Sequence, residues 1–191
     1  MKRKLSFIII ALMTCMAVCA QNADKLYKEG KALYDAKKYT AAVPKLKTAA
    51  EKGHEKAQYR LGRCYDKGHG VNTNEKLAFQ WYYKSATQGY AKAQYQVGKS
   101  YKNGEGVTQD RQKAVAWFTK AANNGNADAQ YHLGKAYMKG KGVTTDKKKA
   151  KSWLSKAVKN EKGGSQILTK IRKEAAEGDE DAKAILALLG K

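Results

Sequence analysis

The sequence repeats itself at an interval of 36 residues between Ala57 and Lys156. Tryptophan marks the interval at positions 81, 117 and 153, and other residue types recur in step with it without any gap. A chain with this periodicity folds as an array of similar supersecondary units that stack on one another. The recurring residues include Trp81, Trp117 and Trp153, Gly62, Gly98 and Gly134, and Lys84, Lys120 and Lys156.

Each unit is predicted to contain two helices. Ala57, Leu61, Cys64 and Tyr65 fall at helical spacing and form one apolar stripe, which ends at Gly68, where a left-handed C-cap is expected. A second helix is expected to begin after an N-cap residue. Two helices this short cannot bury their apolar faces alone, so neighbouring pairs must stack, and a tryptophan is expected to fill the gap between helices. The predicted fold is therefore all-α, a right-handed α-solenoid of stacked helix pairs. The expected N-caps are Asn74, Asp110 and Asp146.

These repeats closely resemble those of the Sel-one-like repeat family, a branch of the tetratricopeptide superfamily. The family pattern A-x-x-x-L-G-x-x-Y-x-x-G-x-G-V, followed by D-x-x-K-A-x-x-W-x-x-K-A-A-x-x-G, is nearly spelled out by residues 93–125. Val97 departs from it by replacing leucine, and Val158 and Glu161 depart from it in the third unit. The resemblance implies a binding scaffold whose function lies on a surface shared by the repeats.

Four parts are predicted along the chain. Residues 1–20 are a signal peptide, and residues 21–54 are an N-terminal tetratricopeptide-like capping pair that lacks the G-x-G-V insertion. Residues 55–161 hold three Sel-one-like repeats of 36 residues. Residues 162–191 follow a break in the period and are predicted to form a C-terminal helical cap, since terminal repeats are usually atypical.

The N-terminal segment predicts export to the periplasm or the cell exterior. It starts with three basic residues, continues with an apolar run over residues 5–18 and ends at Ala20, as in a secretory signal peptide. The run is short for a retained membrane anchor. A lipoprotein anchored through Cys15 or Cys19 is a further alternative, but neither cysteine follows the small residue that such processing prefers.

The net charge indicates acidic partners. The full chain carries +21, and removal of the three basic residues at its start lowers this to +18. Such a field favours acidic protein segments, anionic cell-surface polymers, lipid headgroups or nucleic acid. Export makes nucleic acid the least expected of these partners, whereas a membrane surface stays open.

The family resemblance also indicates which residues face a partner. In tetratricopeptide-like solenoids the first helix of each pair lines the concave face, through the positions three before and one after the conserved glycine. Here those positions pair a tyrosine with a basic residue at i, i+4, on one side of each helix. This ladder suits an acidic peptide. For the tyrosines we favour packing within the scaffold over ligand contact, and for the basic residues both roles stay open. The pairs are Tyr27 with Lys31, Tyr59 with Arg63, Tyr95 with Lys99, and Tyr131 with Lys135.

No motif in the sequence predicts catalysis, a cofactor or a metal. The G-x-G triplets lack the lysine and Ser/Thr pair of a phosphate loop. His54, His69 and His132 occupy unlike positions in their units, so neither a metal site nor a histidine base is indicated. Cys64 is expected to be a small buried residue rather than a reactive thiol.

The sequence thus predicts a non-catalytic scaffold that binds a protein or peptide through a basic, tyrosine-lined concave face. One alternative is binding of anionic polymers or a membrane surface by charge alone. A weaker alternative is a β-lactam-binding or β-lactam-hydrolysing enzyme, as in cysteine-rich secreted relatives. Those relatives carry a disulfide in each repeat, which this sequence lacks, and no S-x-x-K motif is present.

Overall fold

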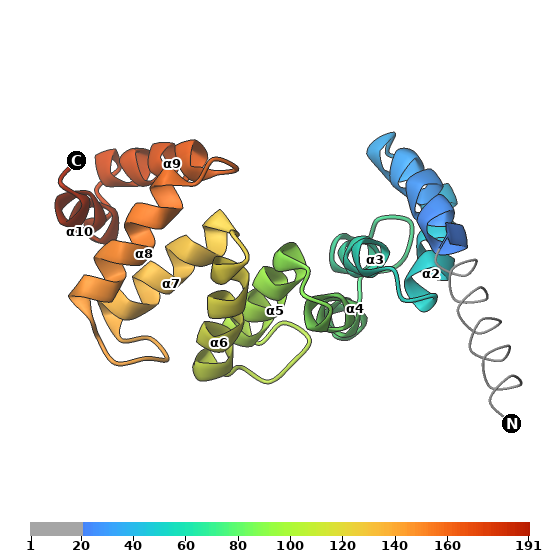
Figure 1. The fold of residues 1–191 in the computed structure, drawn as a ribbon, viewed down its shortest axis with the longest axis horizontal. Helices are drawn as coiled ribbons and strands as arrows, with labels where there is room; N and C mark the ends of the chain where they lie inside the picture. Colours follow the sequence, from blue (N-terminus) through green and yellow to red (C-terminus); the bar gives the residue numbers. More distant parts are fainter. Residues whose placement is uncertain (1–20) are drawn as a thin grey trace, which may run out of the picture. The chain divides into compact units, whose positions relative to one another are not determined.

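The computed structural model describes residues 21–191. The predicted signal peptide, residues 1–20, lies outside the described residues. Residues 21–191 form helices joined by turns and contain no strand (Figure 1). The chain divides into two compact units, the first ending at Gln88 and the second spanning Gly89–Lys191. No helix within residues 21–191 is long and apolar enough to cross a membrane.

The first unit contains a helix over residues 21–35, followed by α2 (Tyr39–Glu51), α3 (Glu55–Lys67) and α4 (Glu75–Thr87). Each of these helices packs on the next along the chain from α2 to α4. Small and branched apolar side chains close the core, because they allow short helices to approach one another. The fully buried residues of this core include Ala42, Leu46, Ala49, Ala57, Leu61 and Cys64.

The second unit contains two helix pairs and two terminal helices. The pairs are α5 (Ala91–Asn103) with α6 (Arg111–Asn123), and α7 (Ala127–Lys139) with α8 (Lys147–Lys159). The terminal helices, α9 (Gly164–Ala176) and α10 (Glu180–Leu189), pack on each other and on α8. They bury apolar residues against α7 and α8, so the end of the second pair is covered. The buried residues at this contact include Tyr131, Leu154, Ile167, Ile171 and Ile185.

The predicted C-cap at Gly68 and the three predicted N-caps of the second helices are confirmed. Gly68 is the C-cap of α3 and has a φ of +69°, a left-handed conformation that glycine adopts without strain. At the start of each second helix, a side-chain oxygen accepts a hydrogen bond from a backbone N–H three residues later, at 2.8 to 2.9 Å. The capping oxygens belong to Asn74, Asp110 and Asp146, and Gly104 and Gly140 are the C-caps equivalent to Gly68.

The recurring glycine in the middle of each first helix permits close contact with the second helix. A Cβ atom at Gly98 would lie 2.6 Å from the ring of Phe118, and one at Gly134 would lie 2.6 Å from Leu154. Gly30 meets Leu46 in the same way, 16 residues later instead of 20, because this pair lacks the four-residue insertion. The residue after each tryptophan, and not the tryptophan itself, therefore makes the closest contact between the two helices of a pair.

Trp81 and Trp153 are partly buried against the core and Trp117 is buried, and each of the three lies beneath a lysine of its own repeat. The Nζ atoms of Lys84, Lys120 and Lys156 lie 4.4, 4.2 and 4.4 Å from the ring centroids of Trp81, Trp117 and Trp153. A cation held over an aromatic face stabilises both side chains. The 36-residue recurrence of these lysines thus has a structural cause, and part of the positive charge serves the scaffold.

A repeated glutamine ties two of the helix pairs to the helix that precedes them. Gln58 and Gln130 are buried, and their Nε2 atoms donate to the backbone oxygens of Ala50 and Ala122 at 3.1 and 3.2 Å. The Oε1 atom of Gln130 accepts a hydrogen bond from Asn160 at 3.2 Å. Because buried polar groups must be paired, these glutamines fix the stacking of neighbouring pairs.

The glycine contact predicts a stability defect. In Gly98→Ala the new methyl group must displace the Phe118 ring, so we expect a loss of about 1–3 kcal/mol from overpacking, offset by under ~1 kcal/mol of gained helix propensity. Urea unfolding followed by circular dichroism measures this. Combining the change with Phe118→Ala should cost less than the sum of the two single changes. An additive double variant, or a stabilised Gly98→Ala, would contradict the role given to this contact.

Candidate partner-binding site

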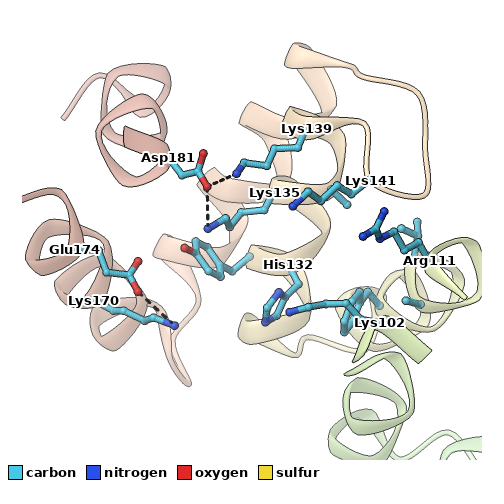
Figure 2. A pocket seen from close by; sticks show the side chains of 14 residues that line it. Lys102, Arg111, His132, Lys135, Lys139, Lys141, Lys170, Glu174 and Asp181 are labelled. Atoms are coloured by element: carbon cyan, nitrogen blue, oxygen red, sulfur yellow. Dashed lines mark hydrogen bonds and ion pairs between the residues drawn. The ribbon is translucent and has the colours of Figure 1, made fainter. Parts of the chain in front are cut away.

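The second unit contains a cavity of about 280 Å³ lined from α5, α6, α7, α9, α10 and the turn after α7 (Figure 2). We call it the basic pocket. Its floor is apolar and aromatic, and its rim carries six cationic side chains and two carboxylates. The floor is formed chiefly by Val115, Phe118, His132 and Ala136; the cations are Lys102, Arg111, Lys135, Lys139, Lys141 and Lys170; the carboxylates are Glu174 and Asp181.

The floor is held in place by aromatic stacking. The rings of Phe118 and His132 are nearly parallel, at 12°, with centroids 5.2 Å apart. Tyr95 and Tyr131 contact His132 with centroid distances of 5.7 and 5.8 Å. Since Phe118 is itself fixed by its contact with Gly98, the repeat packing determines where the floor lies.

His132 is uncharged at neutral pH in this setting. Burial, as the larger cause, and the nearby ammonium groups of Lys102, Lys170, Lys135 and Lys99 together lower its pKa to about 3. Both effects disfavour the imidazolium form. The floor of the basic pocket is therefore neutral although cations surround it.

The rim has more positive than negative charge. Asp181 of α10 forms ion pairs with Lys139 and, at 3.8 Å, with Lys135. Glu174 of α9 lies 3.7 Å from Lys170, four residues earlier on the same helix. Figure 2 shows Asp181 and Glu174 on one side of the pocket and Arg111 on the opposite side. The described residues place no carboxylate at ion-pair distance from the other three cations, Lys102, Arg111 and Lys141.

Lys102 shows the effect of this imbalance. Partial desolvation lowers the pKa of its ammonium group, and the positive charges of Lys99, Lys135 and Lys141 lower it as well, against a small opposing effect from Glu105. Repulsion among cations without enough counter-charge is relieved when an anion binds between them.

The tyrosine and lysine pairs predicted for the second unit lie at or beside this pocket. Tyr131 and Lys135 line it. Tyr131 is only 5% exposed, and burial raises the pKa of its hydroxyl to about 12. The Tyr95 ring contacts two floor residues, with its centroid 5.7 Å from that of His132 and 5.9 Å from that of Phe118, and Lys99 acts on the pocket through its charge. Of these four residues, Tyr131 and Lys135 line the cavity, whereas Tyr95 and Lys99 are not among its lining residues.

The pairs predicted for the first unit are engaged in local contacts. The Tyr27 ring contacts the tilted His54 ring with centroids 4.2 Å apart, and Lys31 donates to Asp35 at 2.6 Å. The Tyr59 ring lies 5.7 Å from that of Tyr82. The guanidinium of Arg63, which is paired with Tyr59 in the prediction, lies 5.8 Å from the centroid of the Tyr34 ring. Partner contact by these residues stays a prediction.

Several pocket residues were missed by sequence reasoning. Lys102 lies three residues after Lys99, and Lys139 lies four residues after Lys135, so extension of the predicted basic stripe by one turn would have found both. His132 follows Tyr131 directly, where the other repeats carry Arg60 and Gln96, and only the packing shows that it forms a floor. Arg111 and the residues of α9 and α10 reach the pocket through tertiary contacts.

The remaining candidate chemistry in the described chain is structural. Cys64 is fully buried, and burial raises the pKa of its thiol to about 11, so little thiolate forms at neutral pH. Residues 21–191 hold no group of three or more His, Cys, Asp or Glu side chains placed to bind a metal ion. Asp110 and Asp146 act as N-caps, as expected.

Three consecutive segments of the chain, residues 55–90, 91–126 and 127–161, match the family model of the Sel1 repeat. The chain belongs to the Sel1 repeat family. The sequence-based recognition is confirmed, and the repeats coincide with the helix pairs α3 with α4, α5 with α6, and α7 with α8.

Solved Sel1 repeat structures share the fold. A Sel1 repeat protein from Oxalobacter formigenes is 33% identical, with a TM-score of 0.69 over 84% of this chain and 74% of that one. The protein c5321, described as a protective antigen present in uropathogenic Escherichia coli strains, is 31% identical, with a TM-score of 0.72 over 88% of this chain and 38% of that one. No curated protein matches the chain. The predicted all-α solenoid is confirmed, and a Sel1 repeat scaffold of this kind fits a role in protein interaction.

The environment of His132 predicts a pH dependence of stability. Its pKa is about 3 in the folded chain and about 6.5 when unfolded. Between these values only the unfolded chain binds the proton, so stability is lost as the pH falls from about 6.5 towards 3, by up to ~1.4 kcal/mol per pH unit.

Urea unfolding of the wild type and of His132→Phe at several pH values tests this prediction. Phenylalanine keeps a ring against Phe118 but cannot take up a proton, so the variant should lose less free energy of unfolding on acidification. Carboxylate protonation affects both proteins and cancels in the comparison. Parallel pH profiles for the two proteins would show that His132 titrates normally.

Proposed function

We propose that this Sel1 repeat protein is a non-catalytic scaffold that binds an acidic protein or peptide segment through the basic, tyrosine-lined concave face of its first helices. The observation that carries the proposal is the basic pocket. Six cationic side chains surround its apolar floor, and only two carboxylates are present to balance their charge. Tyr95, Lys99, Tyr131 and Lys135, at or beside this pocket, are the core of the proposed face in the second unit. Repeat scaffolds commonly bind partners along the extended surface of their stacked helices.

The floor favours binding of a peptide over binding of an anionic polymer by charge alone. An anionic polymer or a lipid headgroup would use the lysines, and its binding would weaken steeply with salt. A peptide can also place side chains on the Phe118 and His132 rings, where apolar contact resists salt.

We also propose that the protein is exported. The support is the basic and then apolar character of residues 1–20, which ends at Ala20. Expression of the full chain in a bacterial host, followed by fractionation and N-terminal sequencing, should yield a mature protein that begins at Gln21 outside the cytoplasm. A chain that retains its N-terminal segment, or begins at Cys15 or Cys19 with a lipid attached, would refute the proposed processing.

Charge reversal tests the binding face. Lys99→Glu combined with Lys135→Glu should weaken binding of a short peptide rich in acidic and aromatic residues by about tenfold or more, since charged hydrogen bonds are lost and repulsion is added. Fluorescence anisotropy at low salt and at ~0.5 M salt measures the effect. The milder Lys99→Gln with Lys135→Gln should act in the same direction and leaves Asp181 without a new repulsive neighbour.

The matched control is Lys147→Glu with Lys151→Glu, which changes the net charge equally on two exposed lysines of α8. It should reduce binding of polyglutamate at low salt and leave the salt-resistant peptide binding unchanged. Equal losses in the control and in the Lys99 and Lys135 variants would favour the polymer alternative. Unchanged peptide affinity in the Lys99 and Lys135 variants would refute the proposed face.

A further inference from the structure

We propose that the basic pocket recognises an acidic residue directly beside an aromatic or large apolar residue in a partner peptide, and that Asp181 occupies part of the same site as an internal competitor. This inference rests on the proposed function and specifies the partner. It assigns the apolar side chain to the floor and the carboxylate to Lys102, Arg111 and Lys141.

The floor specifies the apolar half of the ligand. Phe118 is 3% exposed and fixed from behind, and the neutral His132 ring is stacked on it. Val115 and Ala136 complete a wall without polar side chains. An aromatic ring prefers such an offset or edge contact with other rings, and a carboxylate would lose hydration there without gaining a partner.

The rim specifies the acidic half. Lys102 from α5, Arg111 from α6 and Lys141 from the turn after α7 converge on the pocket from three segments (Figure 2). Within residues 21–191 none of the three has an ion-pair partner. An arginine among them can hold a carboxylate by two parallel hydrogen bonds, whereas the lysines act as point charges.

Asp181 shows that a carboxylate is accommodated at this rim. Its side chain reaches from α10 to Lys139 and Lys135, and these ammonium groups lower the pKa of the Asp181 carboxyl. The carboxylate is thus ionised at neutral pH and reduces the positive potential that an approaching anion meets. The acidic residue of a partner peptide must therefore either bind beside the Asp181 carboxylate or displace it from Lys135 and Lys139.

The size of the cavity limits the ligand. About 280 Å³ lies just below the range for small-molecule sites, so the cavity accepts one or two side chains rather than a large cofactor. The carboxylate and the apolar side chain must both fit in this small cavity. A partner sequence in which the two residues are adjacent is therefore expected to bind better than one in which they are separated.

Two peptides of identical composition test this adjacency. One carries Asp-Phe-Glu in the centre of a Gly/Ser sequence, and the other carries the same three residues separated by Gly/Ser spacers. Fluorescence anisotropy with the full protein should give an affinity about tenfold higher for the contiguous peptide. A third peptide, with Asp-Ala-Glu, should bind at the level of the separated one and lose its affinity in high salt.

Two variants locate the site and act in opposite directions. Lys102→Glu with Arg111→Glu should reduce the affinity for the contiguous peptide about tenfold or more. Asp181→Asn should raise it about two- to fivefold, because the competing charge is removed. A variant that only damaged the fold would weaken binding, so a gain separates competition from a structural role. Lys147→Glu with Lys151→Glu is again the charge-matched control, and thermal melts verify folding.

The outcomes separate this inference from the proposed function. Equal affinities for the contiguous and separated peptides, or full competition by free acetate or phosphate, would overturn the recognition of adjacent groups while leaving acidic-segment binding intact. Unchanged affinity in the Lys102 and Arg111 variant would overturn the proposed location of the site. Weaker binding by Asp181→Asn would overturn the role of Asp181 as a competitor. Failure of all acidic peptides to bind would overturn the proposed function as well.

Discussion

The close contact of the two helices over a glycine is the constraint on which the rest of this structure depends. Without a Cβ atom at Gly98, the Phe118 ring can lie directly on α5, and Gly134 allows the same for Leu154 on α7. Helices that approach this closely bury small residues, so pairs of 13-residue helices can form a core that they could not form at a wider spacing. The same contact fixes the ring on which His132 stacks, and it therefore also positions the floor of the basic pocket.

The positive charge of the chain has two different roles. Lysines such as Lys84 and Lys120 lie over the tryptophans of their own repeats and belong to the scaffold. Lysines of the pocket rim lie near one another, and partial desolvation together with their mutual repulsion lowers the pKa of Lys102. Placing like charges together costs stability, and such a cost is tolerated where a ligand relieves it. Lys135 and Lys170 of the rim also lie over a ring, 5.6 and 5.8 Å from the Tyr131 centroid, so the rim differs from the scaffold lysines in the crowding of its cations.

Much of the fold could be predicted from the sequence, because a gapless repeat fixes helix positions by comparison among its copies. Asn74, Asp110 and Asp146 were found as N-caps in this way. The site was only partly predictable. Tyr131 and Lys135 follow from the repeat, but Arg111 and Asp181 reach the pocket from helices α6 and α10 whose packing no local pattern reveals. The tryptophans marked the repeat correctly, yet the closest helix contact falls to the following residue, since the glycine opposite it decides the geometry.

The central claim is that the basic pocket binds an acidic residue and its aromatic neighbour together. A crystal structure of the protein with the Asp-Phe-Glu peptide tests this most directly. The account predicts the phenylalanine ring against Phe118 and His132, with a peptide carboxylate at hydrogen-bonding distance from Lys102 or Arg111. A peptide bound with its aromatic ring in solvent, or bound on the outer face of α8 with the pocket empty, would contradict it.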